Sequence, residues 1–223
     1  MVRIVGFLLT VSLLLNSVGC HSYSPVFAGL ETVLIDPGHG GFDGGTIAKD
    51  GTLEKHLNLA VSSYLHDLLY VCGVPVTMTR RTDTGLEEDD SESIRNKKVS
   101  DMRRRLALYD SADVVISIHH NHFTSPKYDG TQLFYSPSCL ASSLLAEDLR
   151  QSVIDWVQPQ NTRQSKEATE AIYLLYHTNS PAVLVECGFL SNPDELNKLK
   201  QPAYQQQLAF ALAAGYWKYQ SRR

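Results

Sequence analysis

Beyond residue 30, short apolar runs of strand length alternate along the chain with longer segments of helical period. Strands are predicted at 31–37, 74–80, 112–121, 131–136, 171–176 and 181–190. Helices are predicted where apolar residues recur every three or four positions, at 53–70, 93–110, 140–157 and 204–219. Strands that alternate with helices pack as a parallel sheet covered on both faces. We therefore expect an α/β fold: a three-layer α/β/α domain with a largely parallel, twisted sheet.

The composition supports one domain of this kind. A chain of 223 residues, 43% of them hydrophobic, can bury one good core but not two. Its 20 Lys and Arg against 24 Asp and Glu give a net charge of -4, without the basic excess typical of nucleic-acid binding. We expect residues 29–223 to form a single domain with no nucleic-acid partner.

Residues 1–28 have the order of an export signal. Arg3 is the only formal charge, an apolar stretch follows at 4–15, and small polar residues come next. This stretch is shorter than the roughly 20 residues that span a bilayer, although its extension to Val18 leaves an uncleaved anchor open. A buried N-terminal helix is the structural alternative. We expect cleavage after Ala28, an extracytoplasmic location, and membrane contact only through this segment.

The four cysteines form no recognisable framework. Cys20 invites lipid attachment, but Ser17 stands where an aliphatic residue is expected. Cys72, Cys139 and Cys187 are odd in number and lack CxxC spacing, so neither a disulfide framework nor a thiolate zinc site is indicated. We expect these three to be small buried hydrophobic residues.

Polar residues from four distant segments are expected to meet at one edge of the sheet. His39 follows the first strand, Glu54 begins the next helix, and His119 ends the central strand. Glu186 follows a buried apolar run. Sites in open α/β sheets form beyond the carboxyl ends of strands. Two imidazoles with a carboxylate, leaving a fourth position open, suit a catalytic zinc ion.

Each of these residues also has a structural explanation. His39 could shape a turn, and Glu54 could be a first-turn carboxylate favoured by the helix dipole. Glu186 is harder to explain, because a carboxylate in a buried strand is costly unless it is paired, metal-bound or catalytic. The loop GHGGFDGG at 38–45 resembles a phosphate cradle but lacks the GxxxxGK[ST] spacing. A nucleophilic role for Cys187 has no identified base.

Five motifs together resemble the zinc-dependent N-acetylmuramoyl-L-alanine amidase family. They occur in the family's order across nearly the whole chain beyond the signal: DPGHGGFDGG (36–45), LEKHLNLA (53–60), TRRTD (79–83), SIHHNHF (117–123) and VECGFLSNPDE (185–195). The resemblance implies that one zinc ion per chain is held by His39, Glu54 and His119. It also implies that Glu186 is the catalytic glutamate.

The same resemblance bears on two residues beside His119. Asn121 is an expected substrate contact. His120 occupies a position that varies within the family, so it is not counted as a ligand.

Within the family, the chain resembles the germination-specific, spore-cortex branch. The features that carry this are its compact size, the absence of wall-binding repeats, and the segments GFLSNPDE and LKQPAYQQQLA. The implied partners are peptidoglycan and an activator protein, in cortex maturation (formation of muramic lactam) or wall remodelling.

The implied reaction is hydrolysis of the amide between the lactyl group of N-acetylmuramic acid and L-alanine. Zinc would activate water and polarise the carbonyl, and Glu186 would shuttle the proton. Two alternatives stay open: a zinc peptidase or amidohydrolase acting elsewhere in the wall or on polyglutamyl chains, and a non-catalytic wall-binding protein with the same fold.

Overall fold

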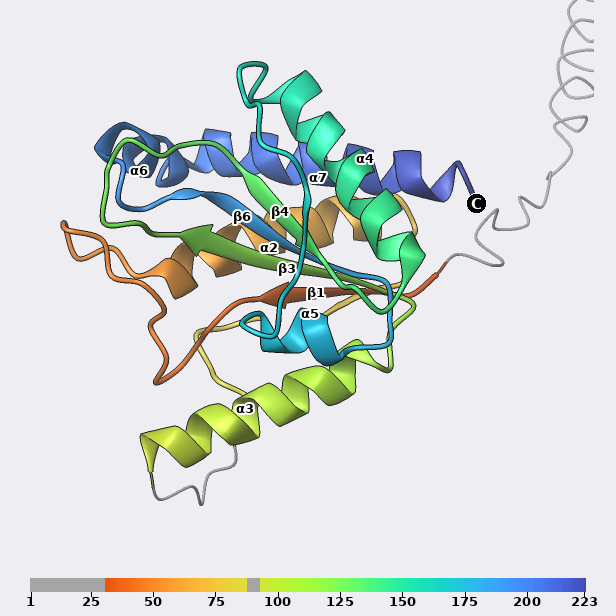
Figure 1. Ribbon diagram of the computed structural model, residues 1–223, viewed down its shortest axis with the longest axis horizontal. Helices are drawn as coiled ribbons and strands as arrows, with labels where there is room; N and C mark the ends of the chain where they lie inside the picture. Colours follow the sequence, from red (N-terminus) through yellow and green to blue (C-terminus); the bar gives the residue numbers. More distant parts are fainter. Residues whose placement is uncertain (1–30, 88–92) are drawn as a thin grey trace, which may run out of the picture.

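The computed structural model describes residues 31–87 and 93–223, which contain a six-stranded sheet between two layers of helices (Figure 1). The sheet order is β2-β1-β3-β6-β4-β5. Only the pair β4 and β6 is antiparallel, and the other neighbouring strands are parallel. The strand bounds are β1 Val33–Pro37, β2 Val76–Met78, β3 Val114–Asn121, β4 Gln132–Tyr135, β5 Lys166–Glu167 and β6 Ala182–Phe189. The predicted three-layer α/β fold with a largely parallel sheet is confirmed.

The helices divide unequally between the two faces of the sheet (Figure 1). One face is covered by α2 (Glu54–Val71), α4 (Leu140–Trp156) and α7 (Pro202–Gln220), with the short α6 (Pro193–Leu199) beside them. The other face is covered by α3 (Ile94–Tyr109) and α5 (Tyr173–His177). Helix α7 packs against both α2 and α4, so these three form one continuous layer.

The apolar core is also divided unequally between the two faces of the sheet. Its larger cluster lies between the sheet and the layer of α2, α4 and α7, and includes Val61, Leu65, Ile116, Val185 and Leu212. The smaller cluster, under α3 and α5, is built on Leu34, Tyr109, Val115, Leu174 and Leu184. β1, β3 and β6 are therefore buried on both faces, which accounts for their continuous apolar runs.

The prediction of a strand at 171–176 is wrong. This segment enters the short helix α5, which buries Leu174 and Leu175 while Tyr173 and Tyr176 stay exposed. A short apolar run satisfies either a buried strand or one turn of helix, so its periodicity cannot separate the two. Helix α6 and the two-residue strand β5 were not predicted.

The expected burial of the cysteines holds for one of the three. Cys187 is buried, but Cys72 is exposed at the end of α2 and Cys139 is half-buried at the start of α4. The predicted export segment and Cys20 lie outside the described residues. Within residues 31–87 and 93–223, none of the helices has the length and apolar character needed to cross a bilayer.

Candidate metal centre

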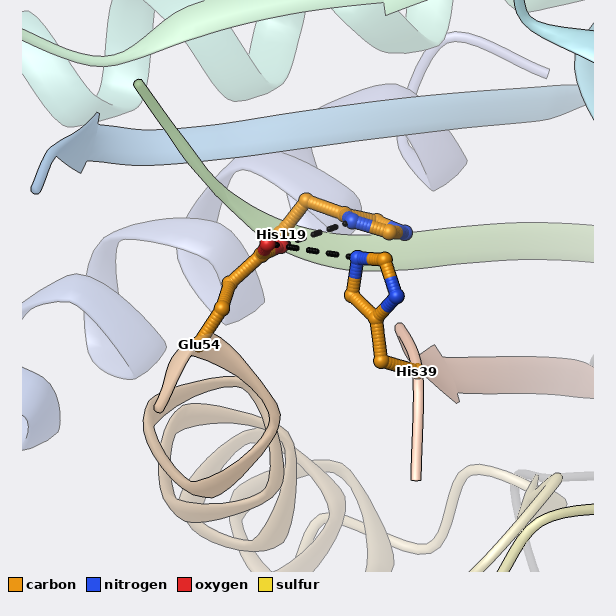
Figure 2. Close-up of side chains that lie close together, drawn as sticks. All are labelled: His39, Glu54 and His119. Atoms are coloured by element: carbon orange, nitrogen blue, oxygen red, sulfur yellow. Dashed lines mark hydrogen bonds and ion pairs between the residues drawn. The ribbon is translucent and has the colours of Figure 1, made fainter. Parts of the chain in front are cut away.

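Three of the predicted site residues come together at one end of the sheet (Figure 2). His39 lies in the loop after β1, Glu54 is the first residue of α2, and His119 lies near the end of β3. The Nε2 atom of His39 is 3.2 Å from Oε2 of Glu54, and Nδ1 of His119 is 3.0 Å from Oε1 of Glu54. One candidate ligand atom from each residue lies within 4.8 Å of the other two.

The loop after β1 holds His39 in an unusual backbone conformation. Its φ angle is 61°, in the left-handed region that a residue with a Cβ adopts only at a cost in free energy. Two buried arginines fix the loop: Arg105 donates to the carbonyl of His39 at 2.8 Å, and Arg80 donates to that of Gly38 at 2.9 Å. The surroundings thus stabilise a conformation that directs the His39 ring toward Glu54.

Two glycines in this loop make room for the side chains of the candidate ligands. A Cβ atom on Gly38 would lie 2.2 Å from the ring of His119. A Cβ atom on Gly45, whose φ is +66°, would lie 2.6 Å from both Glu54 Oε2 and the His39 ring. The glycine-rich sequence therefore allows close approach of the backbone to the metal centre.

Further polar residues orient the candidate ligands. Nδ1 of His39 is 2.9 Å from Oδ2 of Asp43, which leaves Nε2 facing the centre. The buried Asn58, one turn after Glu54 in α2, donates to Glu54 Oε1 at 3.2 Å and to the carbonyl of Gly38 at 3.0 Å. The ring of His120 is 2.7 Å from Asn58 Oδ1, so it packs against α2 and stays out of the cluster. Sequence reasoning identified neither Asp43 nor Asn58.

The charges of the centre are tightly coupled. Burial alone would raise the pKa of Glu54, but hydrogen bonds and charge from His119 and His39 hold that pKa far below its ordinary value. Burial acts against the charged form of His39, yet Asp43 and Glu54 raise the pKa of its ring to about 9. The carboxylates of Glu54 and Asp43 are therefore ionised, and they favour a positive charge at this position, either a proton on His39 or a bound cation.

Glu186 lies beside this cluster in the sheet. Its Cα pairs in register with that of His119, and β6 continues past it to Phe189, so Glu186 is inside the strand. Burial raises the pKa of Glu186 to about 7; the charge of Glu54 adds to this, while His119 and His39 oppose it. Its Oε2 atom is buried and has no hydrogen-bond partner. A carboxyl group with these properties can take up or release a proton near neutral pH.

Asn121 is the last residue of β3, at the same end of the sheet as His119. Its Oδ1 accepts from the backbone N–H of His122 at 2.7 Å, and its carbonyl accepts from that of Leu190 at 2.8 Å. It pairs in register with Phe189. The structure thus places Asn121 two residues beyond His119, with its side-chain oxygen hydrogen-bonded to the backbone of the next residue.

The donor set fits a zinc ion. Two imidazole nitrogens and a carboxylate are borderline ligands of the kind that zinc prefers, and three protein ligands leave a coordination position for water or substrate. The histidine–carboxylate pair of His39 and Asp43 is the usual support of a metal-bound imidazole. The unpartnered Oε2 of Glu186 adds a second observation that this end of the sheet is built for a ligand.

A buried ionic network underlies the His39 loop. Asp36, at 1% exposure, pairs with Arg105 and accepts hydrogen bonds from Tyr109 at 2.6 Å, Thr79 at 2.7 Å and Ser117 at 3.1 Å. Burial opposes its charge, but Arg105 and the hydrogen bonds from Tyr109 and Thr79 lower the pKa of Asp36 to about 2. The network joins β1, β3, α3 and Thr79, the residue after β2, beneath the candidate metal centre.

Comparison with known proteins gives consistent matches. The profile of a family described as N-acetylmuramoyl-L-alanine amidase matches residues 33–216. The germination-specific N-acetylmuramoyl-L-alanine amidase of Bacillus subtilis is 34% identical over 195 residues, which cover 85% of this chain and 79% of that protein. AmiA of Escherichia coli, also an N-acetylmuramoyl-L-alanine amidase, is 29% identical over 233 residues, covering 86% and 76%.

Solved structures agree with these matches. The CwlD amidase from Clostridioides difficile, determined in complex with the GerS lipoprotein, superposes with a TM-score of 0.83 at 36% identity, covering 86% of this chain and all of that one. An N-acetylmuramoyl-L-alanine amidase from Clostridium difficile 630 superposes with a TM-score of 0.74 at 32% identity, covering 87% and 98%.

Proposed function

The chain belongs to the N-acetylmuramoyl-L-alanine amidase family, and from this premise we propose that it hydrolyses peptidoglycan with a zinc ion held by His39, Glu54 and His119. The bond cleaved is the amide between the lactyl group of N-acetylmuramic acid and L-alanine. The observation that carries the proposal is the three-residue cluster, with ligand atoms within 4.8 Å, beside the unpartnered carboxyl oxygen of Glu186.

The bound zinc ion would supply Lewis-acid chemistry, which polarises the scissile carbonyl and makes the attacking water more acidic. The side chains of this chain would do the rest. Glu186 accepts the proton that the water loses, because its raised pKa lies close to neutral and its Oε2 has no competing partner. It then delivers that proton to the alanine nitrogen, so that the C–N bond breaks with a neutral amine as leaving group. Asp43 keeps His39 in the orientation that offers Nε2 to the metal.

The preferred substrate in this proposal is spore-cortex peptidoglycan. Its support is the similarity to the germination-specific amidase of Bacillus subtilis and to CwlD of Clostridioides difficile. Digestion of purified cortex and of vegetative wall, followed by muropeptide analysis, tests this. Preferential cleavage of vegetative wall would contradict it.

The proposal also covers location and an accessory partner. Residues 1–28 would export the 29–223 catalytic domain, consistent with a wall substrate. The solved CwlD is bound to a lipoprotein, which supports an activator protein for this chain. Crosslinking in the source cells, followed by mass spectrometry of the captured complex, tests the partner; recovery of the chain alone would contradict that part of the proposal.

The products identify the reaction. Digested peptidoglycan should yield a free lactyl carboxyl group and a peptide that begins with a free L-alanine amine, both seen by mass spectrometry. Cleavage within the stem peptide or of a polyglutamyl chain would instead indicate another zinc peptidase. Binding to wall without any cleavage would indicate a non-catalytic wall protein.

Variants separate metal binding from proton transfer. Glu186→Gln should retain about one zinc per chain and lose roughly 10²–10⁴-fold in turnover, because the amide cannot accept a proton. His39→Ala and His119→Ala should lose zinc and activity together. His177→Ala, which removes an exposed histidine in α5, is the matched control and should lose neither. Near-parent turnover by Glu186→Gln would refute the assigned role.

A further inference from the structure

Three aromatic side chains gather just beyond the metal centre. We call Phe123, Tyr128 and Phe189 the aromatic shelf: Phe123 and Tyr128 lie in the loop from β3 to β4, and Phe189 is the last residue of β6. The ring of Phe189 stacks on that of Phe123 with centroids 5.8 Å apart, and Tyr128 tilts against Phe123 at 5.1 Å. The loops that carry the shelf leave the sheet at the same end as the loop between β1 and α2 (Figure 1).

The register of the sheet places the shelf relative to the reacting groups. His119 pairs with Glu186, and Asn121 pairs with Phe189 further along the same two strands. At about 3.3 Å per residue, the shelf begins roughly 7–10 Å beyond the level of His119 and Glu186. A substrate whose scissile bond lies at the metal centre would therefore extend over it.

The two apolar core clusters do not account for the packing of these rings. Phe189 is 1% exposed, yet it belongs to neither of the two apolar core clusters. Phe123 is 49% exposed and Tyr128 is 37% exposed, although each packs on the buried ring beneath. The backbone N–H of Phe123 donates to Ser191 Oγ at 3.1 Å, which holds the loop against the turn after β6. The shelf is thus a supported apolar surface that faces solvent.

Polar groups line the border of this surface. The Arg163 guanidinium lies 4.7 Å from the centroid of the Phe189 ring, and the Lys127 ammonium lies 5.2 Å from that of Tyr128. A polar hollow of about 270 Å³ adjoins the shelf and is lined by Asp129, Asn161 and Arg163, among others. An open aromatic face with hydrogen-bonding groups at its border matches a pyranose ring, which has an apolar C–H face and a rim of hydroxyl and acetamido groups.

We infer that the aromatic shelf binds the glycan strand of peptidoglycan, with a sugar ring lying on Phe123 and Tyr128 while the neighbouring muramoyl unit presents its amide to the metal centre. This inference rests on the proposed function and specifies which part of the substrate the shelf takes. Arg163 and Lys127 at its border can donate hydrogen bonds to the hydroxyl and acetamido oxygens of a sugar. The anionic stem peptide is the competing occupant, and the displacement test below distinguishes the two.

The test measures binding without catalysis. Peptide-free glycan strands, prepared by removing all stem peptides from wall, are coupled to beads through their reducing ends and pelleted with the protein, and the bound fraction is titrated. Phe123→Ala should bind roughly three- to tenfold more weakly than the parent. Phe123→Leu, which keeps apolar bulk without the flat ring, should bind as weakly as Phe123→Ala, and Phe123→Trp should restore binding. Phe210→Ala is the matched control, because Phe210 is 47% exposed on α7 and outside the shelf.

Kinetics on intact peptidoglycan give a second readout. Phe123→Ala and Tyr128→Ala should raise KM more than they lower kcat, because the shelf does not touch the reacting atoms. Equal glycan binding by Phe123→Ala and Phe210→Ala would overturn the inference, as would a parent protein that does not pellet with glycan. Displacement by free stem peptides but not by glycan fragments would also overturn it. Because pelleting needs no turnover, an absence of amidase activity would count against the proposed function and leave glycan binding separately measurable.

Discussion

On one face of the sheet, helices α2, α4 and α7 enclose a large apolar cluster, and α2 brings Glu54 to the metal centre at its first turn. On the other face the apolar cluster is small, and the buried pair of Asp36 and Arg105 lies beneath the loop that carries His39. One candidate ligand is therefore positioned by a packed helix and another by hydrogen bonds to a strained loop. Substitutions that disrupt packing on the first face should lower only the free energy of unfolding. Substitutions that disrupt the ion pair on the second face should also weaken metal binding.

The largest effect on stability should come from removing the positive charge of Arg105 on the second face. Arg105→Met leaves Asp36 buried without its cation and removes the donor to the carbonyl of His39, so it should destabilise the fold by about 3–5 kcal/mol. The protein that remains folded should bind zinc more weakly. Urea titration measures the loss of stability, and the zinc content of the same preparation measures the loss of metal binding. Arg103→Met, at an exposed position in the same helix, should change stability by less than about 0.5 kcal/mol. Similar effects from the two variants would contradict the role given to the network.

A cavity on the first face should act on stability alone. Leu65→Ala removes a fully buried side chain of α2 and should cost about 3 kcal/mol of unfolding free energy. Zinc content per folded molecule should equal that of the parent. Val71→Ala, at a 77% exposed position near the end of α2, is the control and should be nearly neutral. A folded Leu65→Ala protein that has lost its zinc would show that packing and metal binding are not separable on this face.

Acid should weaken the ionic network at a defined pH. The pKa of Asp36 is about 2 in the folded protein against its ordinary 3.8, so the unfolded chain takes up this proton first as the pH falls. The stabilisation, about 2 kcal/mol, is complete above about pH 5, shrinks below pH 4 and is lost below about pH 2. Denaturant titrations across this range, on the parent and on Asp36→Asn, measure it. An equal loss of stability on acidification in both proteins would assign the effect to other carboxylates.

The smallest effect should come from a single hydroxyl group. Tyr109→Phe removes one donor to Asp36 and leaves Arg105, Thr79 and Ser117 in place, so it should cost about 1 kcal/mol. Zinc content should be unchanged, since the donor to His39 remains. A loss as large as that of Arg105→Met, measured in the same urea titration, would mean that the hydroxyl group rather than the ion pair keeps Asp36 charged.

The sequence predicts well those parts whose pattern has one structural solution. The runs that became β1, β3 and β6 are continuous and apolar because both faces of these strands are buried, and they bring His39, His119 and Glu186 to one end of the sheet. The apolar run at 171–176 is compatible with either a buried strand or a short helix, and the structure contains the helix. Helix α6 has a signal that could have been used: Asn192 accepts from the N–H groups of Asp194 and Glu195, with Pro193 at the first position.

The supporting residues of the site were harder to predict. Arg105 stands in a run of three arginines, and composition does not distinguish the buried one from its neighbours. Its spacing does, because Asp101 and Tyr109 lie four residues to either side on the same helix face. Asn58, likewise, lies four residues after Glu54. Asp43 has no such signal, since it follows His39 in an irregular loop and only the folded backbone brings them together.

The outer strands of the sheet have a consequence for how the protein behaves at high concentration. The two edges are β2, with three residues, and β5, with two, whereas the longest and most apolar strands lie inside. An exposed edge offers unpaired backbone groups to other chains, and short or charged edges limit such pairing. Both residues of β5, Lys166 and Glu167, are charged and exposed. The sheet thus ends in strands that give little template for aggregation, and its aggregation-prone segments are kept between them.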